Sequence, residues 1–395
     1  MLAAPVVFCI GRHPAGGPYA LADARPPMPL LPPSSDETPA VSVLIVTWNG
    51  RALLERCLPS VLASTGPSFE IVVADNGSAD DTVAWLREAH PAVRVVAHGE
   101  NLLFAEGNNR ALPHCRGRYV CLLNNDVEVE PGWLGPLVAA LDEDPHVAAA
   151  QPKLLRYDLR GQFEYAGAAG GHLDAYGYPF ARGRLFSTLE DDHGQYDAPA
   201  DVFWATGAAC FLRKSALDDV GGSGGVLDRR LGMHMEEIDL CWRLWRAGHR
   251  VRSVPASRAY HIGGASLAQG SPRKAYLNFR NSLLMLYKNL PPRRWAALFP
   301  RRAALDQLAV GRALASGNGA EARAIGRAYA DAHRMKGQFA AERPSSEEDA
   351  VLPDYRGSVA LDYFFRGRKT FGALPAARFR ALGGRDGLEG AVGNP

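Results

Sequence analysis

The stretch VSVLIVTWNG, residues 41–50, joins an uninterrupted apolar run to an abrupt polar end. An apolar run without alternation is typical of a parallel strand that is buried on both of its faces. EIVVAD (70–75), VRVVAH (93–98) and YVCLLN (119–124) repeat this pattern, and helix-like segments lie between the runs. The alternation predicts an α/β fold with a mostly parallel sheet that is flanked by helices on both faces.

Polar side chains follow three of these predicted strands where each strand ends. Thr47 and Asn49 follow the first strand, Asp75 the second, and Asn124-Asn125-Asp126 the fourth. Turn chemistry explains each group taken alone, because Asn and Asp favour turns and helix caps. It does not explain why all three arrive at one rim of the sheet, where ligands bind in open α/β folds. The oxygens of Asp126 also suit a hard divalent cation whose other ligands come from phosphates.

The composition is that of a soluble globular protein. Of the 395 residues 47% are apolar and 22% are charged, and the net charge of +2 gives no indication of nucleic-acid binding. The chain has six cysteines without a CxxC pair and no apolar stretch of 18 residues. We therefore predict reduced cysteines, no transmembrane helix and a cytoplasmic location.

The composition and the apolar pattern change along the chain, and these changes predict four segments. We expect a loosely packed leader at 1–40, an α/β domain at 41–270, a basic helical extension at 271–340 and a weakly structured tail at 341–395. Residues 275–310 interleave apolar residues with Arg and Lys. This pattern suits peripheral contact with the inner face of the plasma membrane, and it equally suits a helix packed on the domain with a solvated basic face.

The segment HMEEIDLCWRLWRAGH predicts an amphipathic helix with three acids in its first turn. Acids favour the positive end of a helix, and Asp239 is placed to pair with Arg243 one turn later. The adjacent Glu236 and Glu237 are more than capping requires, so a carboxylate here can serve as a general base. His261 follows a predicted strand at 250–254 and precedes a Gly-Gly turn that allows close approach to a ligand.

Taken together, the motifs resemble the family 2 inverting glycosyltransferases of GT-A fold. The segments that carry the resemblance occur in the family's order over about residues 41–290: VSVLIVTWNG, VVADNGSADDT, ENLLFAEGNNRAL, YVCLLNNDVEVEPGWL, HMEEIDLCWRLWRAGHRV and AYHIGGAS. The TWNG, NNDVE and EEIDL forms look most like the rhamnosyltransferases and the related galactofuranosyltransferases. The resemblance implies a Rossmann-like, mostly parallel GT-A sheet followed by a helical extension.

The resemblance also implies a reaction and its site residues. A rhamnose-like or galactofuranose-like sugar would move from a dTDP- or UDP-linked donor to a saccharide or lipid-linked saccharide in polysaccharide synthesis, with Mg²⁺ or Mn²⁺. Donor-nucleotide binding falls on Thr47, Asn49, Asp75, Asn101, Asn109, Asn124 and Asn125. Metal binding falls on Asp126 and His261, and the catalytic base is Glu237. We predict the sugar and acceptor pocket at Trp204, Thr206, Gly207 and Glu236, beside loops around 165–178.

Two positions depart from the family pattern. Asn124 replaces the first acid of the metal-binding Asp-x-Asp, so metal affinity would depend on Asp126, His261 and the diphosphate. Glu237 replaces the usual Asp of the base, which moves the carboxylate by roughly 1 Å, and a shift of that size can cost about 10²-fold in rate.

Other functions compete with this one. A non-catalytic sugar-nucleotide-binding module of the same fold would share these motifs and would bind donor without turnover. A nucleotidyltransferase would normally carry a glycine-rich phosphate loop after the first strand, and TWNGRALLE is not such a loop. A dehydrogenase is disfavoured because no GxGxxG follows the first strand.

Overall fold

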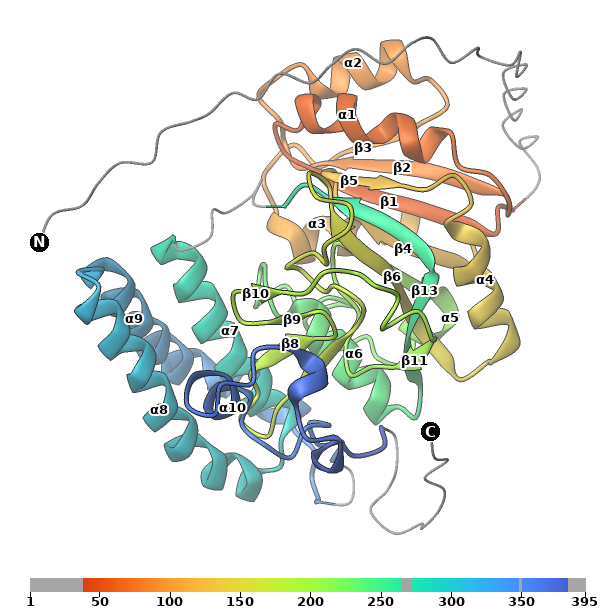
Figure 1. Ribbon diagram of the computed structural model, residues 1–395. Coiled ribbons are helices and arrows are strands. Elements are labelled where there is room, and N and C mark those ends of the chain that lie inside the picture. Colours follow the sequence, from red (N-terminus) through yellow and green to blue (C-terminus); the bar gives the residue numbers. More distant parts are fainter. Residues whose placement is uncertain (1–37, 264–270, 348–349, 383–395) are drawn as a thin grey trace, which may run out of the picture.

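The computed structural model describes residues 38–263, 271–347 and 350–382 (Figure 1). The predicted leader therefore lies outside the described residues, apart from its last three positions.

The predicted parallel strands form one half of the main sheet. β1 (Val41–Thr47) lies between β2 (Phe69–Asp75) and β4 (Tyr119–Leu123), and β3 (Arg94–Ala97) pairs with β2, all in parallel. The register aligns Thr47 with Asp75, so the polar strand ends do meet at one rim. This half confirms the expected parallel arrangement, and the apolar runs of β1, β2 and β4 are mostly buried, whereas β3 at the edge is partly exposed.

The other half of the sheet is mixed rather than parallel. It contains β6 (Val147–Arg156), β12 (Ala209–Arg213), β13 (Arg250–His261) and the short β11 (Ala200–Asp201). The strand order is β11-β13-β6-β12-β4-β1-β2-β3, in which β12 is antiparallel to both β4 and β6. β5 (Val127–Val129) pairs with the far end of β13, so that strand runs on to residue 261 instead of stopping near 254.

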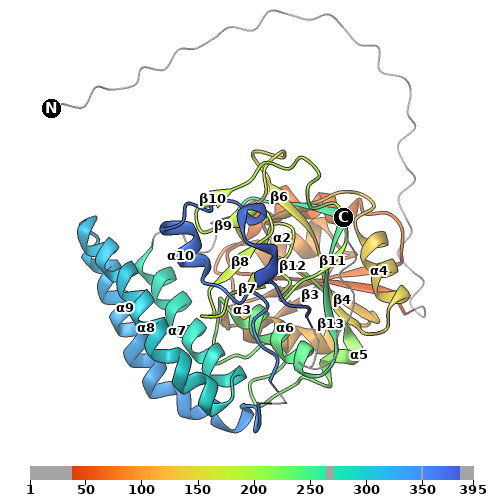
Figure 2. The ribbon, with the colours of Figure 1, turned by 60° about the horizontal axis from the view of Figure 1, so that its bottom comes forward.

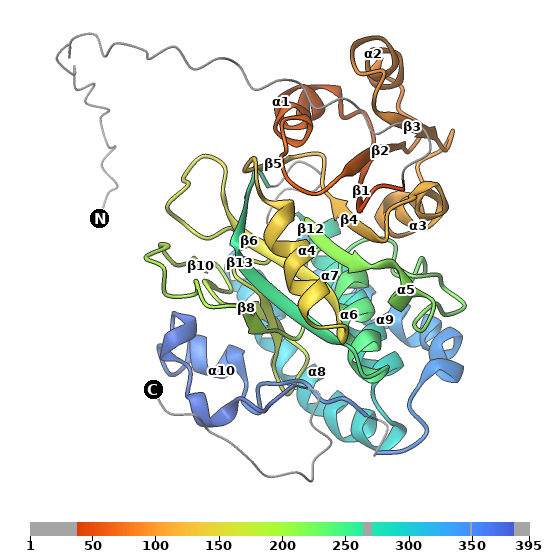
Figure 3. The same cartoon turned by 90° about the vertical axis from the view of Figure 1, so that its right-hand side faces the viewer.

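Helices cover both faces of this sheet, as the sequence predicts. α1 (Arg51–Leu62), α2 (Thr82–Ala89) and α4 (Leu134–Glu143) share one hydrophobic core with one face, and Figure 3 shows α4 lying across β6 and β13. The other core holds α3 (Leu103–Ala111), η1 (Leu112–His114), α5 (Lys214–Leu217) and α6 (Glu236–Arg246). Pro59 does not shorten α1, which continues to Leu62.

The helical extension forms a layer beside the sheet domain (Figure 2). It consists of α7 (Pro272–Asn289), α8 (Pro292–Ala315), α9 (Gly319–Met335) and η2 (Lys336–Glu342). α7 contacts α6 and buries residues 283–286, whereas α8 leaves Leu308 and Leu314 exposed. Within the described ranges, no helix has the length and apolar character that crossing a membrane requires.

A second, antiparallel sheet lies beside the main sheet and packs against residues from the segment 350–382. It is built from β7 (Gly171–Leu173), β8 (Pro179–Ala181), β9 (Arg184–Leu185) and β10 (Thr188–Leu189). α10 (Val359–Phe364), η3 (Phe371–Ala373) and η4 (Ala376–Arg378) follow the extension, and their aromatic residues pack with Phe180 and Leu185. Residues 350–382 are thus more structured than their weak sequence pattern indicates, because their partners lie about 180 residues earlier.

Candidate active site

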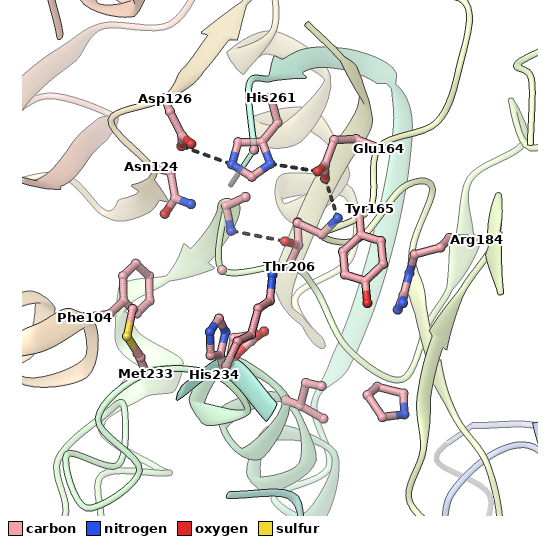
Figure 4. Close-up of a pocket in the computed structure, with 18 of the residues that line it drawn as sticks. Phe104, Asn124, Asp126, Glu164, Tyr165, Arg184, Thr206, Met233, His234 and His261 are labelled. Carbon is pink, nitrogen blue, oxygen red and sulfur yellow. Dashed lines mark hydrogen bonds and ion pairs between the residues drawn. The ribbon is translucent and has the colours of Figure 1, made fainter. Parts of the chain in front are cut away.

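A cavity of about 550 Å³ opens between the rim of the main sheet and the second sheet (Figure 4). Asn124 and Asp126 lie on one side of the view, and Tyr165 and Arg184 lie on the other. Eight of the predicted site residues line it: Asn124, Asp126, Trp204, Thr206, Gly207, Glu236, Glu237 and His261. Segments that are far apart in the sequence therefore converge on one hollow.

Asp126 and His261 meet at the rim of the sheet. The pairing of β5 with β13 sets His261 opposite Val127, and the Ile262 amide donates a hydrogen bond to the Asp126 carbonyl at 3.0 Å. His261 Nε2 lies 3.0 Å from Asp126 Oδ1, and its Nδ1 lies 3.2 Å from Glu164 Oε1. Burial alone would lower the pKa of His261, but the two carboxylates outweigh burial and raise it to about 10.

The residues at this corner fit a divalent cation whose ligands come partly from the protein and partly from a bound substrate. A carboxylate oxygen and an imidazole nitrogen, both ligands for Mn²⁺, converge there within hydrogen-bond distance. In the described part of the chain, no three His, Cys, Asp or Glu side chains are grouped to hold a metal ion by themselves. A bound cation would therefore depend on further oxygens from a ligand such as a diphosphate.

The start of α6 carries two carboxylates that each have one buried oxygen without a partner among the described residues. His234 and Met235, just before the helix, have φ values of 70° and 75°, a left-handed conformation that non-glycine residues adopt at a cost of about 1–3 kcal/mol. The Oε2 atoms of Glu236 and Glu237 are buried and have no hydrogen-bond partner among the described residues. Burial raises the pKa of Glu237 to about 7, and burial followed by repulsion from Glu237 raises that of Glu236 well above its usual value.

Asp239, one turn further along α6, is fully paired. Its carboxylate accepts hydrogen bonds from Lys288 and Asn289 at 2.8 Å each and from Arg243 Nε at 2.8 Å. Burial alone would raise its pKa, but the cations of Lys288 and Arg243 outweigh burial and hold it far below the usual range. The structural role that the sequence favours for Asp239 is the one that its contacts support.

The predicted nucleotide-binding residues of the first two strands lie beside the cavity rather than in its lining. Asn125 Nδ2 donates to Thr47 Oγ1 at 2.9 Å and so links the rim of β4 to the rim of β1. Asp75 Oδ2 accepts the amides of Gly77 and Ser78 at 3.1 and 3.0 Å, which is the turn that its sequence also favours. Asn49 Oδ1 accepts the Ala79 amide at 2.7 Å and braces the same turn.

Asn101 and Asn109 flank the same region and have local structural contacts. Asn101 Oδ1 accepts the Leu103 amide at 3.0 Å at the start of α3. The Asn109 amide group bonds the backbone of Leu227 through both of its polar atoms, at 2.7 and 3.0 Å. Neither residue lines the cavity, so their assignment to nucleotide binding stays a prediction.

The back wall of the cavity belongs to both the core and the site. Trp204 is 2% exposed, and its Nε1 donates to the His172 carbonyl at 2.9 Å. The Thr206 amide donates to Gln151 Oε1 at 3.0 Å, and a Cβ at Gly207 would lie 3.6 Å from Glu237 Cβ. This wall therefore borders the part of the cavity beside Glu237.

Sequence reasoning missed several residues that line the cavity, chief among them Glu164, Arg184 and Lys274. Glu164 and Arg184 come from irregular loops and short strands whose pairing leaves no periodic signal. Tyr165 was anticipated as part of the loop around 165–178, whereas Tyr178 donates a hydrogen bond to Asp306 on α8 and does not line the cavity.

Comparison with known proteins agrees with this geometry. Residues 42–221 match the family model of glycosyl transferase family 2. The chain is 31% identical to the pre-mycofactocin glycosyltransferase of Mycobacterium tuberculosis over 62% of its own length and 47% of that protein. It is 27% identical to the N-acetylglucosaminyl-diphospho-decaprenol L-rhamnosyltransferase of the same organism, over 57% of this chain and 76% of that one.

Among solved structures, the chain resembles GalNAc-T7 crystallised with UDP, GalNAc and Mn²⁺. The TM-score is 0.51 at 15% identity, covering 79% of this chain and 60% of that chain, which supports the shared GT-A fold. The chain spans less than half the length of the first curated relatives that it matches. The family match and the glycosyltransferase relatives agree with the six motifs, and the chain therefore carries, at residues 42–221, a domain of glycosyl transferase family 2.

Proposed function

We propose that the protein is an inverting glycosyltransferase. It moves a rhamnose-like or galactofuranose-like sugar from a dTDP- or UDP-linked donor to a saccharide or lipid-linked saccharide of a cell-surface polysaccharide. The relatives support this class: one is named for transfer of rhamnose to a diphospholipid-linked sugar, and the other is a glycosyltransferase.

Glu237 carries the proposal, because it has the properties of a general base. It lines the cavity, lacks a cationic partner among the described residues and has a pKa near 7 because of burial. A carboxylate with a pKa near neutrality is both available as an anion and basic enough to accept a proton. Asp239 illustrates the alternative, since a carboxylate held by Lys288 and Arg243 is a poor base.

The reaction then proceeds as a single displacement. The acceptor hydroxyl donates a hydrogen bond to Glu237, and its proton passes to that carboxylate as the oxygen bonds to the anomeric carbon. The bond from the anomeric carbon to the diphosphate oxygen breaks at the same time, and the nucleoside diphosphate leaves with the bonding electrons. Because attack and departure occur on opposite faces of the sugar, the anomeric configuration inverts.

The opposite side of the cavity is where charge develops on the leaving group. Asp126 and His261 would hold Mg²⁺ or Mn²⁺ together with the diphosphate, and such an ion supplies electrostatic stabilisation of the departing oxygens. Asn124 and Asn125 would offer amide donors to the diphosphate, and Thr47 and Asp75 would contact the nucleoside.

A donor screen tests the proposal. Full-length protein is incubated with dTDP- and UDP-linked sugars, and release of nucleoside diphosphate is followed with Mg²⁺, with Mn²⁺ and with a chelator. We expect acceptor-dependent release with at least one donor and loss of release with the chelator. Binding of donors without any turnover would instead support a non-catalytic sugar-nucleotide-binding module.

Helix α8 is the part of the basic extension that suits peripheral contact with a membrane. It exposes Leu308 and Leu314 beside the exposed Arg301 and Arg312. Flotation with anionic liposomes tests this contact on the full chain, comparing wild type with a double variant, Leu308→Ser and Leu314→Ser. Equal flotation of the two proteins would contradict it.

A further inference from the structure

Arg184 is a buried cation without a protein counter-charge. Six Lys and Arg residues are buried in the described part of the chain. Carboxylates pair with four of them, which are Lys153, Arg243, Lys288 and Arg302. Arg182 instead donates twice to the Ala169 carbonyl, at 2.9 and 2.6 Å.

Arg184 has none of these partners among the described residues. It is 7% exposed, its Nε has no hydrogen-bond partner, and its guanidinium lies 4.6 Å from the centre of the Tyr165 ring. It also lines the cavity and lies at its edge in Figure 4. Burial of an unpaired charge is costly, so this arrangement favours a ligand that completes the pairing.

Lys274 adds a second positive charge at the same place. It sits in the first turn of α7, lines the cavity, and its Nζ lies 5.5 Å from the centre of the same Tyr165 ring. No carboxylate among the described residues lies within ion-pair distance of Lys274 or Arg184. Burial and, second, the charge of Lys274 lower the pKa of the neighbouring His234 to about 4, so this histidine stays neutral beside the two cations.

These two cations belong to the side of the cavity away from the nucleotide-binding strands. Arg184 comes from β9 of the second sheet and Lys274 from the helical extension, whereas Thr47, Asp75 and Asn125 lie on the rim of β1, β2 and β4. Arg156 also lines the cavity, but Asp158 neutralises it at 2.7 Å. The positive charge that lacks a carboxylate partner among the described residues is therefore concentrated on the side of the cavity away from β1, β2 and β4.

We propose that Arg184 and Lys274 form an anion subsite for the acceptor. The acceptor would carry a phosphate or a carboxylate near the hydroxyl that receives the sugar. The planar guanidinium of Arg184 matches two oxygens of either group, and Lys274 adds a point charge. This inference rests on the proposed glycosyl transfer, because it names the class of acceptor for that reaction.

Binding of three simple probes to the full chain tests the subsite. Octyl phosphate, octyl glucuronide and the neutral octyl glucoside share one alkyl chain, and each is titrated by calorimetry with and without UDP plus Mn²⁺. We expect at least one anionic probe to bind about tenfold or more tightly than octyl glucoside, and UDP plus Mn²⁺ not to displace it. The stronger of the two anionic probes identifies phosphate or carboxylate as the recognised group.

Variants assign the binding to the two cations. Arg184→Gln and Lys274→Gln should each weaken the anionic probe by about 10–100-fold and leave octyl glucoside unchanged. Arg273→Gln removes an exposed neighbouring charge and should bind like wild type. Because Lys274 is only half-buried, its variant keeps the test valid if Arg184→Gln unfolds.

Three results would overturn the subsite: equal affinity for all three probes, an equal loss in Arg273→Gln, or displacement by UDP plus Mn²⁺. Nucleoside diphosphate release is measured on the same preparations. Failure of wild type to release it with any donor contradicts the proposed function and not the anion binding. Release with acceptors that need no anion contradicts the subsite alone.

Discussion

Helix α6 places carboxylates in two opposite environments within one turn. On the cavity side, Glu237 has no cation beside it, and burial raises its pKa to about 7. On the core side, Asp239 contacts Lys288, Arg243 and Asn289, and its pKa lies far below the usual range. In the proposed reaction, the same chemical group serves as a proton acceptor on one side of the helix, and on the other side it anchors the structure.

The two sides depend on each other through the backbone. Lys288 of α7 pairs with Asp228 at 2.7 Å and Asp239 at 2.8 Å, which ties the loop before α6 and the helix itself to the extension. Glu237 keeps its unfavourable site because these contacts hold the helix in place. The stability that the ion pairs of Asp239 contribute offsets the cost of burying Glu237 without a cation.

The largest expected effect is the loss of transfer in Glu237→Gln. Without the carboxylate the acceptor hydroxyl has no base, so kcat should fall by about 10²–10⁴-fold while donor affinity stays the same. Steady-state kinetics and donor calorimetry measure the two effects. Glu88→Gln, an exposed glutamate on α2, serves as the control and should match wild type. Near-normal transfer by Glu237→Gln would remove this residue from the mechanism.

Lys288→Met should destabilise the fold more than any other single change in this region. It leaves the buried carboxylates of Asp228 and Asp239 without their shared cation, which typically costs about 3–5 kcal/mol in the free energy of unfolding. Urea denaturation measures it, with Lys336→Met as a control that should stay within about 0.5 kcal/mol. A loss no larger than that of the control would show that the pairing is not needed.

The pH dependence of transfer should reflect Glu237. Because the base must be ionised, log kcat/KM is expected to rise with a slope near one up to a pH of about 7 and then level off. Burial and repulsion from Glu237 also raise the pKa of Glu236 well above its usual value, so the two neighbouring carboxyl groups disfavour simultaneous ionisation. A profile that is flat between pH 5 and 7 would contradict the role of this carboxylate.

The smallest expected effect is a gain in stability when the base is removed. The pKa of Glu237 is about 7 in the fold and 4.5 in its ordinary environment, so ionisation costs stability as pH rises from 4.5 to 7. Glu237→Gln should therefore melt a few degrees above wild type at pH 8 and at the same temperature near pH 4. Thermal unfolding followed by circular dichroism at both pH values measures the difference. A lower melting temperature at pH 8 would mean that the carboxylate is stabilised rather than strained.

The sequence predicts those parts of the fold that are determined by residues close together in the chain. The apolar runs of β1, β2 and β4 and the polar residues that end them indicate the sheet and its rim, and EEIDL indicates the start of α6. The mixed half of the sheet was less predictable, because the direction of β12 depends on pairing with strands far away in the chain.

The acceptor side of the cavity could not be predicted for the same reason. Arg184 lies on a strand of two residues, and the pairing of Lys288 with Asp239 spans 49 positions. Nothing in the neighbouring residues distinguishes Arg184, whose Nε has no hydrogen-bond partner among the described residues, from Arg182, which donates to a backbone carbonyl. Only the folded chain shows which cations lack a counter-charge.

The anomeric configuration of the product tests the account most directly. Once the donor screen identifies a substrate pair, NMR coupling constants of the new glycosidic linkage can be compared with those of the donor. A single displacement assisted by Glu237 predicts complete inversion. Retention of configuration would contradict it, because retention requires two displacements or a different face of attack.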